Sequence, residues 1–259
     1  MKMFLKGLLF STAMAFGGAA TAAEQPQPPA CRAQTFAAVN YIICAADPGK
    51  AHLRLFWKDA EGKPYRTFAH VAEALAAEGK SLTFAMNAGM YKDDFSPLGL
   101  FVADGETLAP ANTFEIKGSP GSVPNFYKKP KGVFFLEDRH AGILPMDTYL
   151  KRRGKATFAT QSGPMLVIDG KTNPIFIPGS TDRTRRSGVG ICESGVVRFA
   201  ISDGPVNFHD FARLFRDELK CSNALFLDGG RGAGTYVPAL DREDWSGHGG
   251  YGPIVGLVE

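Results

Sequence analysis

Ten short apolar segments recur between residues 52 and 258, and they constrain the fold more than any other feature of the sequence. Most are followed by glycine, asparagine, aspartate or another turn-forming residue, which is typical of β-strands. In residues 52–57 the apolar positions alternate, so that Leu53, Leu55 and Trp57 share one face. The ten segments are 52–57, 81–86, 98–103, 132–137, 156–161, 164–168, 188–192, 196–202, 223–228 and 253–258.

Turns and helices complete this pattern. Residues 98–108 and 163–176 each contain a strand followed by Asp-Gly, the strongest two-residue hairpin signal. Residues 70–79 and 207–220 have apolar residues at helical spacing, with Gly79 as a stop and Asn207 as an N-cap. The sequence therefore predicts an α/β (α+β) fold: a single strand-rich domain with a mixed, twisted β-sheet and a few packed helices.

The first residues have the features of an export signal. Lys2 and Lys6 precede an apolar run that is too short to span a membrane, and small residues follow it. We predict a signal peptide over residues 1–23, a disordered Pro-rich leader over 24–30 and the folded domain over 31–259. The mature protein is then periplasmic or secreted, with no membrane span after removal of the signal.

Charge and cysteine content limit the partners and the kinds of site that the protein can have. Without Lys2 and Lys6, the 29 basic residues fall to 27 against 26 acidic ones, a formal net charge of +1 that argues against a nucleic-acid partner. Four cysteines in an exported chain indicate two disulfides, and three pairings are open. We favour Cys31–Cys44 and Cys192–Cys221, because these pairs join neighbouring segments. No CxxC pair is present and the histidines are scattered, so we expect no metal site and no cofactor, although Asp-rich turns leave calcium open.

Four polar clusters stand at the ends of predicted strands. Three arginines, Arg183, Arg185 and Arg186, precede Ser187 and Gly188, and such a loop suits phosphate oxygens. Its alternative interpretation is a solvated basic loop. Asp228 ends an apolar strand and precedes Gly229 and Gly230, where partial burial shifts the pKa of a carboxyl group. The alternative there is an ordinary Asp-Gly turn. The other two clusters are residues 87–94 and 161–164.

Taken in order, the four clusters resemble the phosphodiester glycosidase family, closest to its exported bacterial branch. The similar runs are N-A-G-M-Y, S-G-P-M-L-V-I-D-G, R-S-G-V-G and F-L-D-G-G, and the resemblance covers roughly residues 50–258. The family implies hydrolysis of the bond between the anomeric carbon of a sugar and a phosphodiester. An oxocarbenium-like transition state needs a nearby carboxylate, and phosphate is a good leaving group.

The resemblance also implies roles for particular residues. It places Asp228 as the main catalytic carboxylate, Arg186 as the phosphate ligand and Asn87 as a residue that orients the substrate. The chain departs from the family after the aspartate, where Arg231 and Thr235 stand in place of the usual serines. Thr235 is a candidate for the missing hydroxyl and Arg231 for a second phosphate contact, and the alternative is an altered site. We expect Asn87, Arg186 and Asp228 to converge on one cleft. The further residues expected to bind substrate are Gly89, Tyr91, Asp93, Ser162, Gly163, Arg183, Ser187, Gly188, Asp203, Gly229, Gly230 and Arg231.

The sequence thus predicts an exported hydrolase that cleaves the glycosidic bond of a sugar-1-phosphodiester, as found in envelope glycans. The alternative is a non-catalytic periplasmic protein that binds phosphorylated glycans through the same arginines. The partner in both cases is a phosphorylated glycan or a sugar phosphodiester.

Overall fold

The computed structural model describes Met1 and residues 31–119 and 121–259. The signal peptide predicted for residues 1–23 and the leader predicted for 24–30 lie outside the described residues, apart from Met1. The folded part is strand-rich with a few packed helices, as predicted. Its strands form three antiparallel sheets rather than the single mixed sheet that we expected.

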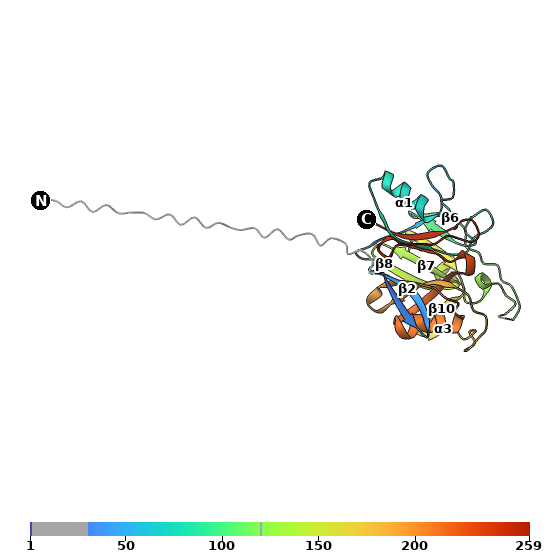
Figure 1. The fold of residues 1–259 in the computed structure, drawn as a ribbon. Coiled ribbons are helices and arrows are strands. Elements are labelled where there is room, and N and C mark those ends of the chain that lie inside the picture. The colour runs from blue at the N-terminus through green and yellow to red at the C-terminus, as the bar shows by residue number, and fades with distance from the viewer. Residues whose placement is uncertain (2–30, 120) are drawn as a thin grey trace.

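Sheet A has seven strands, of which β2 and β10 are labelled in Figure 1, and it carries both disulfides. In spatial order its strands are β1 (Arg32–Phe36), β2 (Val39–Ala46), β13 (Val197–Ser202), β12 (Arg186–Cys192), β14 (Cys221–Gly229), β10 (Met165–Ile168) and β11 (Lys171–Thr172). One disulfide, Cys31–Cys44, ties the start of β1 to β2. The other, Cys192–Cys221, joins the end of β12 to the start of β14.

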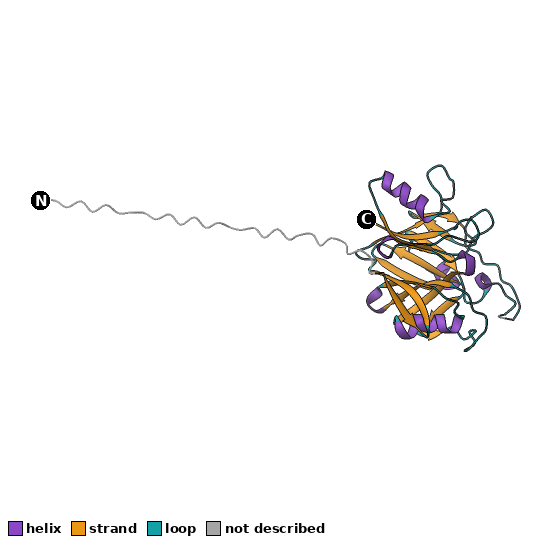
Figure 2. Cartoon of the chain, viewed as in Figure 1, coloured by secondary structure: helices purple, strands orange, loops and turns teal. Residues whose placement is uncertain are grey.

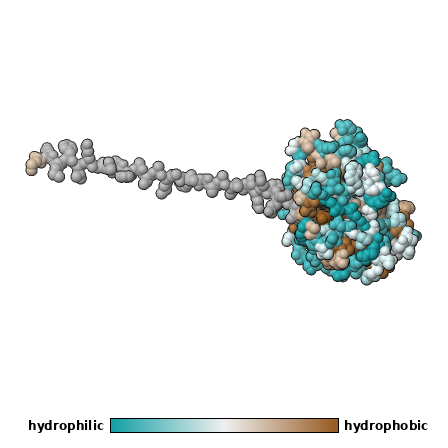
Figure 3. All heavy atoms as spheres, viewed as in Figure 1, coloured by the Kyte–Doolittle hydropathy of each residue, from teal (hydrophilic) through white to brown (hydrophobic). Residues whose placement is uncertain are grey.

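Sheets B and C have five strands each. Sheet B consists of β16 (Arg242–Glu243), β15 (Thr235–Val237), β4 (Leu82–Asn87), β17 (Ile254–Val258) and β3 (His52–Phe56). Sheet C consists of β6 (Glu106–Ala109), β5 (Phe101–Ala103), β9 (Phe158–Ser162), β7 (Gly132–Glu137) and β8 (His140–Pro145). The inner faces of all three sheets share one apolar core, which includes Phe84, Phe134, Phe199 and Leu225. Figure 3 shows the consequence outside: the visible face is largely hydrophilic, with scattered apolar patches.

Each sheet has a helix against its outer face (Figure 2). Helix α1 (Phe68–Ala77) covers sheet B, α2 (Met146–Lys151) covers sheet C, and α3 (Phe208–Arg213) covers sheet A. In Figure 1, α1 and α3 lie at opposite ends of the stacked layers. The described residues also form four short 3₁₀ turns, Asn125–Tyr127, Glu193–Gly195, Gly230–Gly232 and Pro238–Leu240, and one π-helical turn, Leu214–Glu218. No helix in the described part of the chain is long and apolar enough to cross a membrane.

Both Asp-Gly hairpins are confirmed. Asp104-Gly105 joins β5 to β6, and Asp169-Gly170 joins β10 to β11. All four residues have positive φ, between 46° and 79°, which is the backbone that this turn requires.

The expected helices are present with shifted bounds. α1 starts two residues earlier than expected, because the Thr67 hydroxyl accepts a hydrogen bond from His70 N at 3.1 Å and caps it. Asn207 caps α3 as predicted, by accepting from Asp210 N at 2.8 Å. The single helix expected over 207–220 is α-helical only in α3 and continues as a π-helical turn at Leu214–Glu218. Leu214, Phe215 and Leu219 in this region are buried.

Two strand predictions also need correction. Residues 98–100 do not join β5, because Leu100 N donates to the Gln161 side chain at 3.0 Å instead of to a backbone carbonyl of β9. The β1–β2 hairpin was missed altogether. Most side chains of β1 are exposed, so this edge strand carries no apolar signal.

Candidate active site

The ends of β4, β9 and β14, one from each sheet, meet at one edge of the molecule. The hydroxyl of Thr160, on β9, donates to the carbonyl of Ala88 just after β4, at 2.8 Å. The hydroxyl of Ser162, at the end of β9, donates to the carbonyl of Leu227 on β14, at 2.9 Å. These two hydrogen bonds bring the first, second and fourth polar clusters of the sequence together.

Gly89 makes this close approach possible. Its φ of 150° lies at the edge of the region that favours glycine, and a Cβ atom there would lie 3.1 Å from Thr160 Oγ1 and 3.3 Å from the carbonyl oxygen of Gln161. Any side chain at position 89 would therefore separate the end of β4 from β9.

Asn87 is fully buried at the end of β4 and holds the segment that follows Asp228. Its Oδ1 accepts from Gly234 N at 3.1 Å, and its backbone N–H donates to the Gly234 carbonyl at 3.2 Å. The other amide atom, Nδ2, has no hydrogen-bond partner among the described residues. A buried donor without a partner is unfavourable unless a ligand or water accepts from it, so Asn87 carries spare hydrogen-bonding capacity at this edge.

Asp228 is half-buried at the end of β14, and hydrogen bonds fix its backbone. The Ser187 hydroxyl lies 3.2 Å from Asp228 N and 3.1 Å from its carbonyl oxygen. Carboxylate Oδ1 accepts from Gly229 N at 2.7 Å, while Oδ2 lies against Gly232, where a Cβ atom would overlap it. No donor in the described part of the chain reaches Oδ2, so that oxygen is available to a ligand.

Burial raises the pKa of the Asp228 carboxyl from its ordinary 3.8 to about 7, and only the Gly229 N–H opposes the shift. A carboxyl group with this pKa exchanges its proton readily at neutral pH, which is what acid–base chemistry requires.

The structure does not bring the Arg186 guanidinium together with the Asp228 carboxylate. On the paired strands β12 and β14, Ser187 lies opposite Asp228 and Arg186 lies opposite Gly229. Successive residues of a strand face opposite sides, so Arg186 points to the outer face of sheet A. There it is fully buried and stacks on the Phe208 ring at 3.6 Å, and its Nε donates to the Val206 carbonyl at 2.9 Å.

This burial lowers the pKa of Arg186 to about 10. Its Nη1 has no hydrogen-bond partner among the described residues.

Four more of the predicted residues make no contact with Asp228 among the described residues. Arg183 is beside Asp210 of α3, at 3.9 Å, and Asp203 is paired with Arg242 at 2.9 Å. Gly188 is a packing position, because a Cβ atom there would lie 3.1 Å from Phe215 and 3.2 Å from Phe211. Asp93 is exposed on the loop after β4.

Other predicted residues do gather near Asp228. Tyr91 is half-buried and donates to the Gly250 carbonyl at 2.8 Å, and its pKa is raised by burial and by the nearby Asp228 charge. Arg231 is exposed and immediately precedes Gly232. Gly229 and Gly230 form the turn, with Gly230 at φ 57°, and Gly163 follows Ser162 closely packed against the Phe126 carbonyl. The Thr235 hydroxyl is already occupied, because it donates to the Ala85 carbonyl at 2.8 Å.

The loop at residues 244–250 was not predicted, although it contacts this edge. Ser246 Oγ lies 3.3 Å from the Arg231 carbonyl and 3.4 Å from the Tyr91 hydroxyl, and the His248 ring is 6.5 Å from the Tyr91 ring. The only local signal was the glycine-rich run Gly247-His248-Gly249-Gly250, which is typical of a tight loop.

The described residues hold no group of three or more His, Cys, Asp or Glu side chains placed to share a metal ion. The expectation that the protein uses no metal and no cofactor, with calcium left open, stays a prediction.

The sequence is similar to a known family and to a known bacterial protein. A model of the phosphodiester glycosidase family matches residues 80–251. The chain is 32% identical over 183 residues to protein YigE of Escherichia coli K12. The aligned part covers 71% of this chain and 69% of YigE.

Two solved structures share the fold. The catalytic domain of zebrafish N-acetylglucosamine-1-phosphodiester alpha-N-acetylglucosaminidase, auto-inhibited by its pro-peptide, has a TM-score of 0.60 at 15% identity, over 88% of this chain and 81% of that one. A Burkholderia pseudomallei protein whose name calls it exported has a TM-score of 0.51 at 13% identity, over 85% and 74%. The matched motifs, the fold and the sequence identity lead to one conclusion: the chain belongs to the phosphodiester glycosidase family.

Proposed function

We propose that this protein is an exported hydrolase that cleaves the bond between the anomeric carbon of a sugar and a phosphodiester. The observation that carries the proposal is the half-buried Asp228 carboxyl, which has a pKa of about 7 and lies where strand ends from three sheets meet. Membership of the family supports the reaction class.

In this mechanism the sugar binds beside Asp228 with its anomeric carbon near the free oxygen Oδ2. As the bond to phosphate breaks, positive charge develops on the sugar ring, and an ionised Asp228 stabilises it and activates the attacking water. The leaving phosphate needs little protonation, so one carboxylate can suffice. The spare Nδ2 donor of Asn87 supports its predicted role of binding and orienting a substrate hydroxyl.

We assign the phosphate contact to Arg231 rather than to Arg186. Arg231 is exposed and adjoins Gly232, against which Asp228 Oδ2 packs, whereas the Arg186 guanidinium is buried on the other face of sheet A. The Arg231 carbonyl also accepts from Gly247 N at 2.9 Å, so the backbone that carries this arginine is held in place.

The test is release of reducing sugar from a panel of sugar-1-phosphodiesters. Asp228→Asn should abolish turnover, while Asp169→Asn, the same change at an exposed carboxylate in the β10–β11 turn, should leave it within about twofold. Wild-type turnover in Asp228→Asn would sink the assignment. Binding without release across the whole panel would favour the alternative of a glycan-binding protein.

Arg231→Ala tests the phosphate contact separately. It should lower kcat/KM for phosphodiesters by about 10- to 100-fold, as expected for loss of one charge-assisted contact, and spare a neutral aryl glycoside. Equal losses on both substrates would argue against a phosphate role. Hydrolysis in ¹⁸O-labelled water should place the label in the sugar, and label in the phosphate would show cleavage of the other ester bond.

Export is part of the proposal. Two disulfides favour an oxidising compartment, and a structural relative is called exported. N-terminal sequencing of the protein from the periplasm or medium should begin at Glu24, and an uncleaved chain in the cytoplasm would contradict export.

A further inference from the structure

A cavity lies at the other end of strands β9 and β17 from the edge that carries Asp228. Strand β9 runs from Phe158, which lines this cavity, to Ser162 at the candidate active site. Strand β17 connects the same two regions, because Val258 pairs with His52 at the cavity and Ile254 pairs with Asn87. Four residue steps along a strand span about 13 Å, so the two regions are distinct.

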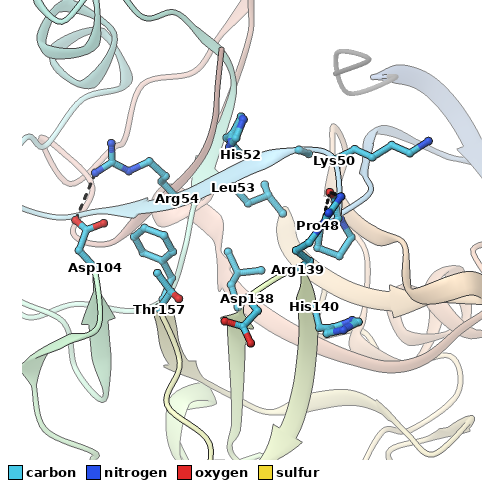
Figure 4. A pocket seen from close by; sticks show the side chains of 14 residues that line it. Pro48, Lys50, His52, Leu53, Arg54, Asp104, Asp138, Arg139, His140 and Thr157 are labelled. Atoms are coloured by element: carbon cyan, nitrogen blue, oxygen red, sulfur yellow. Dashed lines mark hydrogen bonds and ion pairs between the residues drawn. The ribbon is translucent and has the colours of Figure 1, made fainter. Parts of the chain in front are cut away.

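The cavity, which we call the β3 pocket, has an apolar floor and walls fixed by the backbone. Its volume is about 580 Å³, within the range of small-molecule sites. Leu53, Leu136 and Phe158 of the central core form the floor. The turn before β3 and the β7–β8 turn form two walls, and the Arg139 guanidinium joins them by donating from Nε to the Gly49 carbonyl at 3.0 Å (Figure 4).

The lining of the pocket carries a small excess of positive charge, because three basic side chains (Lys50, Arg54 and Arg139) stand against two acidic ones (Asp104 and Asp138). Arg54 is paired with Asp104 at 3.4 Å, whereas Lys50 and Arg139 have no carboxylate within 4 Å among the described residues. Arg139 is bound only to a neutral carbonyl, so its charge is uncompensated. In Figure 4 the remaining acid, Asp138, points away from the contact between Arg139 and Gly49.

We propose that the β3 pocket binds an anionic sugar unit, a sugar that carries a phosphate or carboxylate group. Lys50 and the free edge of the Arg139 guanidinium would bind the anion. The apolar floor would pack against the face of the sugar ring. The hydroxyl of Thr157 and the imidazoles of His52 and His140, which also line the pocket, would bind sugar hydroxyls. This site does not depend on the catalytic proposal, because it shares no residue with the edge that carries Asp228.

Calorimetric titration of the oxidised mature protein with glucose 1-phosphate tests the proposal. Lys50→Glu and Arg139→Gln should each weaken binding at least fivefold. The glutamine retains a donor for the Gly49 carbonyl while removing the charge. The matched control is Lys171→Glu, the same charge change on the exposed strand β11, and it should bind like the wild type.

Titrations with related compounds test whether the β3 pocket needs both the sugar and the anionic group. Neutral glucose and inorganic phosphate should each bind at least tenfold more weakly than glucose 1-phosphate, since each lacks half of the contacts. Comparison with glucuronate shows whether phosphate or carboxylate is preferred. Phosphate that binds as tightly as the sugar phosphate, or binding unaffected by both pocket variants, would overturn the proposal. Asp228→Asn should keep the Lys50-dependent binding even if it abolishes turnover, which separates the two sites.

Discussion

Burial shifts the pKa values of two ionisable side chains, Asp228 at the end of β14 and Arg186 at the start of β12, in opposite directions. It raises the pKa of Asp228 to about 7 and lowers that of Arg186 to about 10, because it disfavours the charged form of each. The consequences differ. Asp228 leaves Oδ2 open to a ligand, whereas Arg186 is enclosed by aromatic rings and backbone carbonyls. The environment of Asp228 therefore suits a residue that reacts with a ligand, and that of Arg186 suits a residue that stabilises the fold.

Arg186→Ala should therefore reduce stability. It removes hydrogen bonds to the carbonyls of Val206 and Asp182 and leaves a cavity beside Phe208. We expect a loss of about 3 kcal/mol in the free energy of unfolding, measured by urea denaturation. Arg186→Met, which fills most of the space without the charge, should lose less. The exposed Arg183→Ala should lose under about 0.5 kcal/mol. An Arg186→Ala protein of normal stability that binds phosphodiesters weakly would instead favour a ligand role.

Asp228 should make stability depend on pH. Its carboxyl binds a proton near pH 7 in the folded protein and near pH 3.8 when unfolded, so between these values the folded state holds more protons. The contribution of Asp228 to the free energy of unfolding must then fall as pH rises from about 4 to about 7. Asp228→Asn removes this effect.

The variant should be more stable than the wild type at pH 8, by about 1 kcal/mol because Asp228 is only half-buried, and equal to it near pH 4. Melting temperatures across this range check the prediction. A variant less stable than the wild type at pH 8 would contradict it.

At the scale of elements, the candidate site exists because β4 and β9 approach each other more closely than side chains usually allow. The approach depends on Gly89 and on the hydrogen bond from Thr160 to the Ala88 carbonyl. A change that moved β4 and β9 apart would also displace Asn87, which lies two residues before Gly89.

Gly89→Ala should separate these strand ends. The added methyl group meets Thr160 Oγ1 and the Gln161 carbonyl, and φ at this position is strained for alanine. We expect a loss of about 1 to 3 kcal/mol in the free energy of unfolding and a larger proportional loss of kcat/KM. Gly121→Ala is the matched control, since nothing lies within 4 Å of its added Cβ atom. Equal behaviour of the two variants would show that the close approach is unimportant.

At the scale of the whole molecule, two disulfides tie sheet A together and close segments 13 and 29 residues apart in the sequence. Removing either pair as a double alanine variant should lower the free energy of unfolding by about 3 kcal/mol in the chain-entropy model. Denaturation of the variants, with the reduced wild type for comparison, checks this. Unchanged stability would mean that the reduced, unfolded chain retains structure across the same segments.

The sequence was enough to predict most strands, both Asp-Gly hairpins and the family, because alternation, turn residues and motif order are local signals. It was not enough to predict which way Arg186 points. That direction follows from the register of β12 against β14, which contains an irregularity between Ser187 and Gly188. An extra residue, Leu227, lies there opposite no partner, and nothing in the local sequence marks it. Strand β1 was missed for a related reason, since its exposed side chains form no apolar pattern. Strand β2 was also not predicted, although its run of buried apolar residues is a local signal.

The Cys192–Cys221 bond has a consequence for how the site is assembled. It joins directly opposed residues at the far end of the two strands whose pairing decides which face Asp228 occupies. A slip of one residue would turn the carboxylate toward α3 and expel it from the edge where the three sheets meet. The closed bond opposes such a slip, because it fixes the pairing of Cys192 with Cys221 at one end of the two strands. The closed bond therefore helps to hold β12 and β14 in the alignment that directs the Asp228 carboxylate toward the edge where the three sheets meet.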